Sequence, residues 1–222
     1  LPGMMKPDIR ELILTEILKQ CAEYGVEDIH MIIAICLHRR MTGPEIREIV
    51  GTKIYNEYYP DKLYNHDAED PDEIVELGES EGGHVVRLNR RAVESDLLIY
   101  VNVNFVPMDG GHKSVTVGLC DYRSVSEHHN TKTMHKCHSY MDPRHDKSQL
   151  AKRVDLMGQL VDQNLKVFHI ETAINNRMFG GPLSFLNRPE RTWSTFDWAK
   201  LRASNAALER MPEAGRRGIF EK

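Results

Sequence analysis

Two chemistry-bearing side chains lie where a parallel sheet would place an active site. His38 directly follows an isoleucine-rich apolar run at residues 29–37, and Lys113 follows a second apolar run at residues 97–106 and a pair of glycines. Ligands of open α/β sheets bind outside the carboxyl ends of the strands. A histidine there can exchange a proton near neutral pH, and a lysine can offer a fixed charge or an amine nucleophile. The spacing predicts an active site at these strand ends, and a histidine that merely caps the strand is the structural alternative.

The glycines before the lysine are Gly110 and Gly111. Adjacent glycines let backbone N–H groups approach a phosphate or carboxylate closely. The full P-loop pattern GxxxxGK[ST] is absent, because no glycine stands at the required earlier position. By itself the stretch is a weak indicator of a site, and a plain turn is the simpler interpretation.

Histidines also gather between residues 128 and 145. They are His128, His129, His135, His138 and His145, with Cys137 among them. Imidazole and thiolate are favoured ligands of zinc, nickel and copper, but this spacing fits no structural zinc pattern. For each of them a solvated surface position is the simpler interpretation. His66 is equally consistent with a turn stabiliser and with a site residue.

The composition is that of an ordinary globular protein. Apolar residues make up 41% of the 222-residue chain and charged residues 28%, with a net charge of −4. This balance gives no basic field for nucleic acid or an anionic membrane. We find no membrane-spanning run or signal peptide, and the four cysteines form no CxxC pair. Reduced thiols and a cytoplasmic location are expected.

The pattern of elements favours an α/β fold. A helix is expected from Pro7 to Gly25, then a buried strand at residues 29–37, then a helix opened by a capping box of Thr42 and Glu45. The further elements expected are a surface connection with one short strand at residues 60–83, strands at 84–88, 97–106 and 166–174, and helices at 148–164 and 198–211. We predict a mostly parallel, Rossmann-like layered sheet with flanking helices.

Two regions are expected along the chain. Residues 1–174 form the catalytic-type α/β domain, and residues 175–222 form a C-terminal loop and helical extension. Residues beyond 174 begin with a loop-like sequence before the final helix, which is why the boundary is placed there.

Four segments in order resemble the nickel-pincer lactate racemase family. They are IIAICLHRRMTGPEIREIVG, NHDAEDPDEIVELG, VVRLNRRAVESDLLIYVNVNF and GGHKSVTVGL, and the match is best over residues 8–130. The resemblance implies a racemase or epimerase of a small-molecule 2-hydroxy acid. It also implies a nickel pincer nucleotide tethered to a lysine, which accepts hydride while a base removes the hydroxyl proton. The planar 2-keto acid then takes hydride back on either face.

The resemblance implies roles for individual residues. Lys113 corresponds to the tethering lysine, in a turn whose Gly110 and Gly111 match the family's glycines. His38 corresponds to one of two histidines that deprotonate the substrate hydroxyl. His129 corresponds to the histidine that completes nickel coordination, with neighbouring His128 as the alternative.

The chain departs from the family pattern in three places. Val103, beside Asn104, stands where the second catalytic histidine is expected, and neither can act as a base. His112 is a conceivable substitute but lies in the wrong register. The family's Asp-Thr-Arg segment would precede Leu1, and its C-terminal domain has no evident counterpart. We therefore expect an excerpt of a longer protein or a diverged relative. With one base missing, epimerisation of a sugar acid or a one-directional redox step fits as well as lactate racemisation.

Two other hypotheses stand beside this one. In the first, the α/β domain binds a metal or a hydroxy acid without the pincer cofactor, and His38, His128 and His129 hold zinc or nickel. In the second, the domain is purely structural, its glycine–lysine stretch is a turn, and its histidines face solvent.

Overall fold

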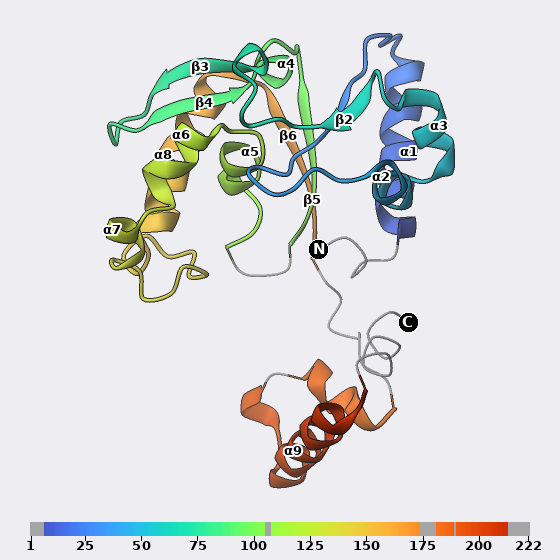
Figure 1. Cartoon of the computed structure of the whole chain (residues 1–222), viewed down its shortest axis with the longest axis vertical. Coiled ribbons are helices and arrows are strands. Elements are labelled where there is room, and N and C mark those ends of the chain that lie inside the picture. The colour runs from blue at the N-terminus through green and yellow to red at the C-terminus, as the bar shows by residue number, and fades with distance from the viewer. Residues whose placement is uncertain (1–6, 105–107, 174–180, 189, 213–222) are drawn as a thin grey trace. The chain divides into compact units, whose positions relative to one another are not determined.

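The computed structural model describes residues 7–104, 108–173, 181–188 and 190–212 (Figure 1). The chain divides into two compact units, one of residues 7–173 and a smaller one that includes residues 181–212. No helix in the described part of the chain has both the length and the apolar character needed to cross a membrane.

The larger unit alternates short helices and strands. In chain order its elements are α1 (Pro7–Glu23), β1 (Met31–Ile33), α2 (Gly43–Val50), α3 (Thr52–Tyr58), β2 (Leu63–Asn65), η1 (Pro71–Glu73), β3 (Ile74–Glu79), β4 (Val85–Asn89), α4 (Arg90–Val93), β5 (Leu98–Asn104), α5 (His112–Gly118), α6 (Tyr122–His128), α7 (Thr131–Met134), α8 (Gln149–Asn164) and β6 (Val167–Ala173). The smaller unit contains η2 (Gly181–Asn187), η3 (Glu190–Thr192) and α9 (Thr195–Arg210).

The described strands pair in three two-stranded sheets. β1 pairs with β2 and β5 pairs with β6, both in parallel, whereas β3 and β4 pair antiparallel. The predicted mixture of helices and strands with parallel pairing is confirmed. The Rossmann-like layered sheet is not confirmed, because the described strands form three separate two-stranded sheets.

Two of the predicted segments differ from the structure. β1 covers three residues of the expected strand at 29–37, because its partner β2 pairs with it only from Met31 to Ile33. Beyond β1 the chain turns, and Cys36 adopts a left-handed φ of 53° and donates its N–H to Gly118 O at 3.0 Å. The segment at 60–83 holds more than one short strand, since β2 and all of β3 fall within it. The many polar and acidic residues of this segment gave no apolar run from which these strands could be predicted.

The short helices α3 to α7 were not predicted, whereas several other elements follow their sequence signals closely. Thr42 and Glu45 form the expected capping box at the start of α2, and Gly25, with a φ of 72°, follows the end of α1. Ser148 caps α8 by accepting a hydrogen bond from the Ala151 N–H. Each terminus is satisfied by a side chain or a glycine that the pattern places there.

The main hydrophobic core lies under the second half of the larger unit. It joins β4, α5, α6 and α8, and its fully buried members include Val86, Leu88, Val115, Leu119, Met157 and Val161. Figure 1 shows α8 below the β3–β4 hairpin, with α5 on the side of the long β5–β6 pair. A separate cluster of Ile46, Val50, Ile54 and Leu63 packs α2 and α3 against α1 and the β1–β2 pair. The first cluster buries Val115 of α5 and Leu119 directly after it, and so holds this helix in place.

A histidine fastens α5 to α8. His112 places Nδ1 at 2.5 Å from Asp155 Oδ1 and Nε2 at 2.7 Å from Asp162 Oδ2. Gly158 lies between the two aspartates along α8, and a side chain there would overlap the His112 ring. Burial lowers the pKa of His112, but the hydrogen bonds to Asp162 and Asp155 outweigh it and raise the pKa above its usual value. The charged imidazole is therefore part of the packing.

The smaller unit is held by an aromatic cluster and a capping carboxylate. Trp193 contacts Phe185 and Trp198 edge to face, each with ring centroids 5.2 Å apart. Asp197 accepts hydrogen bonds from the Ser194 N–H and from Arg188, and these bonds lower its pKa. The helix predicted at 198–211 is confirmed and begins slightly earlier, at Thr195.

The buried core at Leu88 gives a first prediction. Leu88 is fully buried, so Leu88→Ala should lower the free energy of unfolding by about 2–5 kcal/mol through lost contacts and a cavity. The matched control is Leu12→Ala, because Leu12 is 70% exposed and its truncation should change stability far less. Urea unfolding of both variants measures the difference, and equal effects would show that Leu88 is not a core residue.

The clamp at His112 gives a pH prediction. A raised folded-state pKa means that this contribution to stability is complete below the unfolded pKa of about 6.5 and is lost as pH rises through the folded value. The stability difference between wild type and His112→Asn should shrink as pH rises from 6 to 9. Urea midpoints across that range measure it, and a difference that grows with pH would contradict the clamp.

Candidate active site

Lys113 lies in the first turn of α5, immediately after the paired glycines. Gly110 and Gly111 have φ values of 88° and 53°, a region that glycine enters without steric cost. The Lys113 ammonium forms an ion pair with Asp109, with Nζ 2.6 Å from Oδ1. The side chains of both residues are mostly buried. The turn therefore presents a half-buried cation at the end of the long β5 strand.

A carboxylate from the neighbouring strand occupies the donor side of this turn. Glu171 on β6 accepts a hydrogen bond from the Gly111 N–H, with Oε1 2.5 Å from the nitrogen. Its Oε2 accepts from Asn104 Nδ2 at 3.0 Å. The Gly111 N–H, which could have approached an anionic ligand, is thus engaged by the protein itself. Sequence analysis did not identify Glu171. It becomes a candidate only when the parallel register of β5 and β6 is known, because this register places Glu171 opposite Asn102.

The position of the expected second histidine carries no base. Val103 is buried, and the amide of Asn104 lies in a chain of hydrogen bonds from Asn102 to Glu171. His112 does not substitute, because both of its ring nitrogens are engaged by carboxylates of α8. An open depression of about 650 Å³ lies on the His112 side of the turn, where Asp155, Asp162, Lys166 and His169 also line it.

His128 and His129 meet at the end of α6. Their Nδ1 atoms are 2.5 Å apart, so one ring donates a hydrogen bond to the other. His128 is fully buried, and burial, followed by the charges of His129, His84 and Arg153, lowers its pKa to about 3. Its Nε2 is buried with no hydrogen-bond partner in the described structure. His128 is therefore a neutral interior residue.

His129 is exposed but interacts with the lysine turn. Loss of hydration lowers its pKa, and the positive charge of Lys113 lowers it further. This charge effect is the link between Lys113 and His129, and no hydrogen bond or ion pair joins the two side chains among the described residues.

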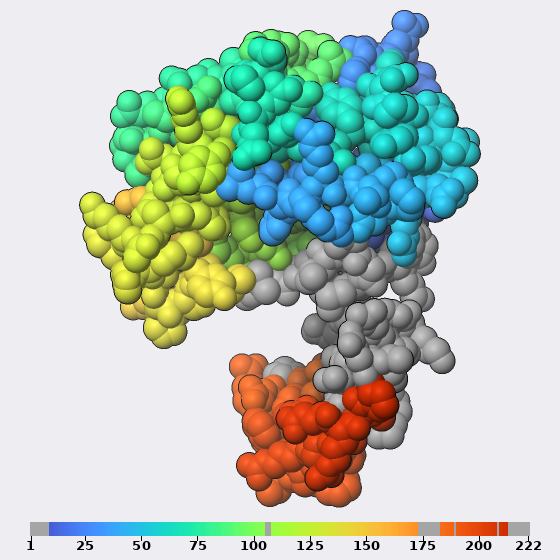
Figure 2. Space-filling model, in the orientation of Figure 1, coloured from blue at the N-terminus to red at the C-terminus, as the bar shows by residue number. Residues whose placement is uncertain are grey.

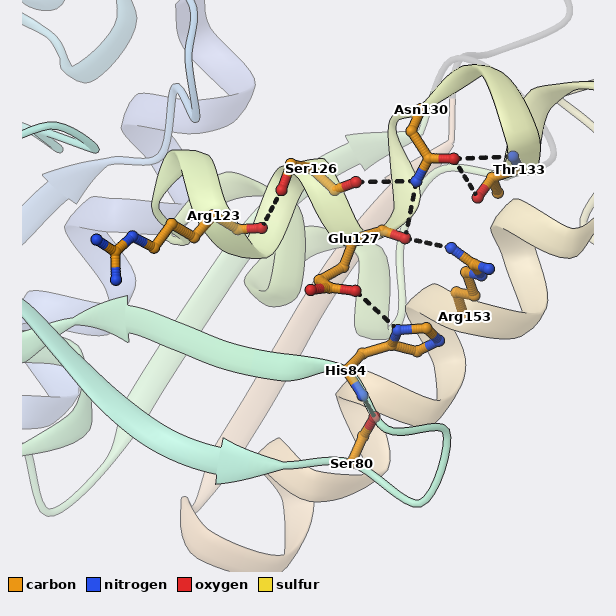
Figure 3. Close-up of polar contacts among 8 residues, drawn as sticks. All are labelled: Ser80, His84, Arg123, Ser126, Glu127, Asn130, Thr133 and Arg153. Atoms are coloured by element: carbon orange, nitrogen blue, oxygen red, sulfur yellow. Dashed lines mark hydrogen bonds and ion pairs between the residues drawn. The ribbon is translucent and has the colours of Figure 1, made fainter.

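A polar network behind the two histidines fixes the end of α6 (Figure 3). The Glu127 carboxylate is 3.1 Å from His84 Nδ1 at the start of β4, and its backbone carbonyl accepts a hydrogen bond from Arg153 of α8. Asn130 donates to the Ser126 and Glu127 carbonyls and caps α7 through Thr133. Glu127 thus ties the residue before the histidine pair to His84 and to α8, and Asn130 ties the residue after the pair to α6 and α7.

His38 lies in the turn that follows β1. Its side chain is exposed, and its backbone N–H donates to Ile35 O at 2.9 Å. Figure 2 shows atoms of the segment between β1 and α2 at the surface of the unit. Through Cys36 the same turn contacts Gly118, the last residue of α5. Gly118 is five residues beyond Lys113, or about 7.5 Å along the helix axis. The segments of His38 and Lys113 thus meet opposite ends of one short helix, and a common cleft for the two side chains stays a prediction.

The other histidines proposed from the sequence have different surroundings from those of Lys113 and His129. His66 is buried, with Nε2 2.9 Å from Cys120 O and Nδ1 3.3 Å from Asn89 Nδ2, so it stabilises the fold. His138 and His145 are exposed. Within the described ranges, no group of three or more histidine, cysteine, aspartate or glutamate side chains is placed to hold a metal ion.

Comparison with known proteins identifies the same family as the four sequence segments. The model of the lactate racemase N-terminal domain matches residues 4–142. The lactate racemase of Lactiplantibacillus plantarum is 28% identical over 106 residues, which cover 46% of this chain and 24% of that protein. The chain therefore spans about a quarter of the length of this curated relative.

Two solved structures share the fold. The lactate racemase apoprotein from Thermoanaerobacterium thermosaccharolyticum superimposes with a TM-score of 0.62 at 17% identity, over 78% of this chain and 41% of that one. A protein from Thermotoga maritima gives a TM-score of 0.57 at 16% identity, over 74% and 43%. Because the family model covers more than half of the chain, the chain belongs to the lactate racemase N-terminal domain family.

Proposed function

We propose that this chain is the part of a 2-hydroxy-acid racemase or epimerase that carries a lysine-tethered nickel pincer nucleotide. The observation that carries the proposal is the position of Lys113 in the first turn of α5, directly after two glycines with positive φ. Family membership favours a racemase, and the lysine turn supplies the amine to which the cofactor would be attached. The substrate would be a small-molecule 2-hydroxy acid.

The donor set at the end of α6 fits a nickel ligand. With Nδ1–H of His129 as the donor to His128 Nδ1, Nε2 of His129 keeps its lone pair and would be available to a metal. A histidine ligand is commonly oriented by a hydrogen bond to its second nitrogen, and His128 provides that contact. His128 itself is fully buried. We therefore propose His129, rather than His128, as the ligand.

The chain's own residues would divide the remaining tasks. Lys113 holds the cofactor, and Asp109, 2.6 Å from its amine, is placed to accept the proton that the ammonium must lose before it forms a covalent bond. His38 takes the proton of the substrate hydroxyl. When bound, the cofactor supplies an acceptor for the hydride of the substrate carbon. Val103 and Asn104 give no second base beside β5, so the two directions of the reaction are expected to differ in rate.

Attachment at Lys113 is directly measurable. Co-production with the cofactor-synthesis machinery should add a mass adduct that peptide analysis locates to Lys113, and Lys113→Ala should lose both the adduct and turnover. Lys132→Ala is the control, because Lys132 is an exposed lysine of α7. The circular dichroism of Lys113→Ala should match wild type. Full turnover of a 2-hydroxy acid by this variant would reject the assignment.

The proton-transfer role of His38 is tested separately. His38→Ala should lower kcat by about 10²–10⁴, the usual contribution of a positioned base, and leave the affinity for a 2-keto acid nearly unchanged. His138→Ala serves as the control, since its side chain is 76% exposed. An unchanged kcat in His38→Ala would remove His38 from the mechanism.

A further inference from the structure

The contacts of Glu171 join three separate parts of the larger unit. It stands on β6, it receives a hydrogen bond from Asn104 at the end of β5, and it receives another from the backbone of Gly111. Asn104 in turn accepts from Asn102 Nδ2 at 2.8 Å. His169 Nδ1 lies 3.8 Å from Glu171 Oε1. A single carboxylate therefore connects the ends of two parallel strands to the turn that starts α5.

The fit around this carboxylate is close. A Cβ at Gly110 would overlap Glu171 Oε2 and would come within 2.8 Å of Asn104 Nδ2. Gly110 therefore has two reasons to be glycine, its positive φ and the approach of Glu171. The Gly111 N–H donates to a carboxylate, and hydrogen bonds to an ionised acceptor are about twice as strong as neutral ones.

Among the described residues, no hydrogen bond or ion pair joins Lys113 to Glu171. The effect of Glu171 on Lys113 is therefore indirect. The turn from Asp109 to Lys113 closes with the ion pair between those two side chains. Gly110 and Gly111 are the middle of that turn, and Glu171 holds them from the strand side. Release of the glycines would let the turn and its lysine adopt other conformations, because glycine has more of them than any other residue.

We propose that Glu171 is the positioning residue of the lysine turn. Its carboxylate holds Gly110 and Gly111 against the ends of β5 and β6, and this contact directs the Lys113 amine toward Asp109 and the His129 side. The structural part of the proposal is independent of any cofactor, and only its catalytic consequence rests on the proposed function. No external anion is needed at the Gly111 N–H, because Glu171 is already there.

Three variants test this assignment in the full 222-residue chain. Glu171→Gln keeps one oxygen for the Gly111 N–H but replaces the acceptor that faces Asn104 with an amide. The exchange variant Glu171→Gln with Asn104→Asp restores that hydrogen bond in the opposite direction, and it restores the negative charge. Glu76→Gln is the matched control, because Glu76 is an exposed glutamate in strand β3.

Two readouts report on the turn without any cofactor. In Glu171→Gln, amide hydrogen exchange of the 109–114 segment and amine-reagent labelling of Lys113 should both become about tenfold faster, as expected when a charge-assisted hydrogen bond is lost. Labelling of the exposed Lys132 should not change. The exchange variant remakes the bond between residues 104 and 171 but leaves a neutral oxygen at the Gly111 N–H, so it should return both rates part of the way to wild type, and Glu76→Gln should leave them unaltered.

A catalytic readout then separates positioning from proton transfer. In the enzyme loaded with cofactor, Glu171→Gln should lower kcat with little change in KM and should keep the wild-type pH profile. Wild-type exchange and labelling rates in Glu171→Gln would overturn the proposal, and so would loss of one limb of the pH profile, which would make Glu171 a proton acceptor. If wild type never forms the Lys113 adduct, the proposed function fails, but the exchange and labelling results still decide the role of Glu171.

Discussion

The ion–dipole contact between the Glu171 carboxylate and the Gly111 N–H is the constraint on which the candidate site depends. A parallel pair of strands ends with its carbonyl and amide groups at one edge, and the chain must turn sharply there to begin a helix. Two glycines with positive φ make this turn, and such residues have many alternative conformations. A carboxylate from the adjacent strand selects one of them. The conformation of the glycine turn in turn sets the position of Lys113.

The helix α5 connects the two parts of the candidate site, the turn of Lys113 and the turn of His38. Its first turn carries Lys113, and its last residue accepts the backbone hydrogen bond of Cys36 in the turn that carries His38. His112 fastens the same helix to α8 through two carboxylates, and α8 also holds the end of α6 beneath His129 through Arg153. A seven-residue helix is too short to be stable by itself. Its position is therefore set by tertiary contacts, and these are the contacts that arrange the candidate residues.

The sequence predicted what local signals encode. The capping box at Thr42, the helix at 148–164 and the strand at 166–174 follow from hydrophobic period and capping chemistry, and the structure contains them. Long-range pairing was beyond such signals. The strand expected at 29–37 is shorter because it pairs with β2 over three residues only, and Glu171 could be found only from the register of two strands far apart in the chain. The histidine cluster likewise separated into buried and exposed members because burial depends on packing rather than on spacing.

The neighbourhood of Lys113 and His129 is the central spatial claim, and an NMR titration of the His129 ring tests it most directly. Burial and the charge of Lys113 lower the pKa of His129, so removal of that charge in Lys113→Met should raise the pKa, whereas Lys132→Met should not. A His129 pKa that is the same in wild type and Lys113→Met would show that the two side chains do not share a site, and would contradict the account.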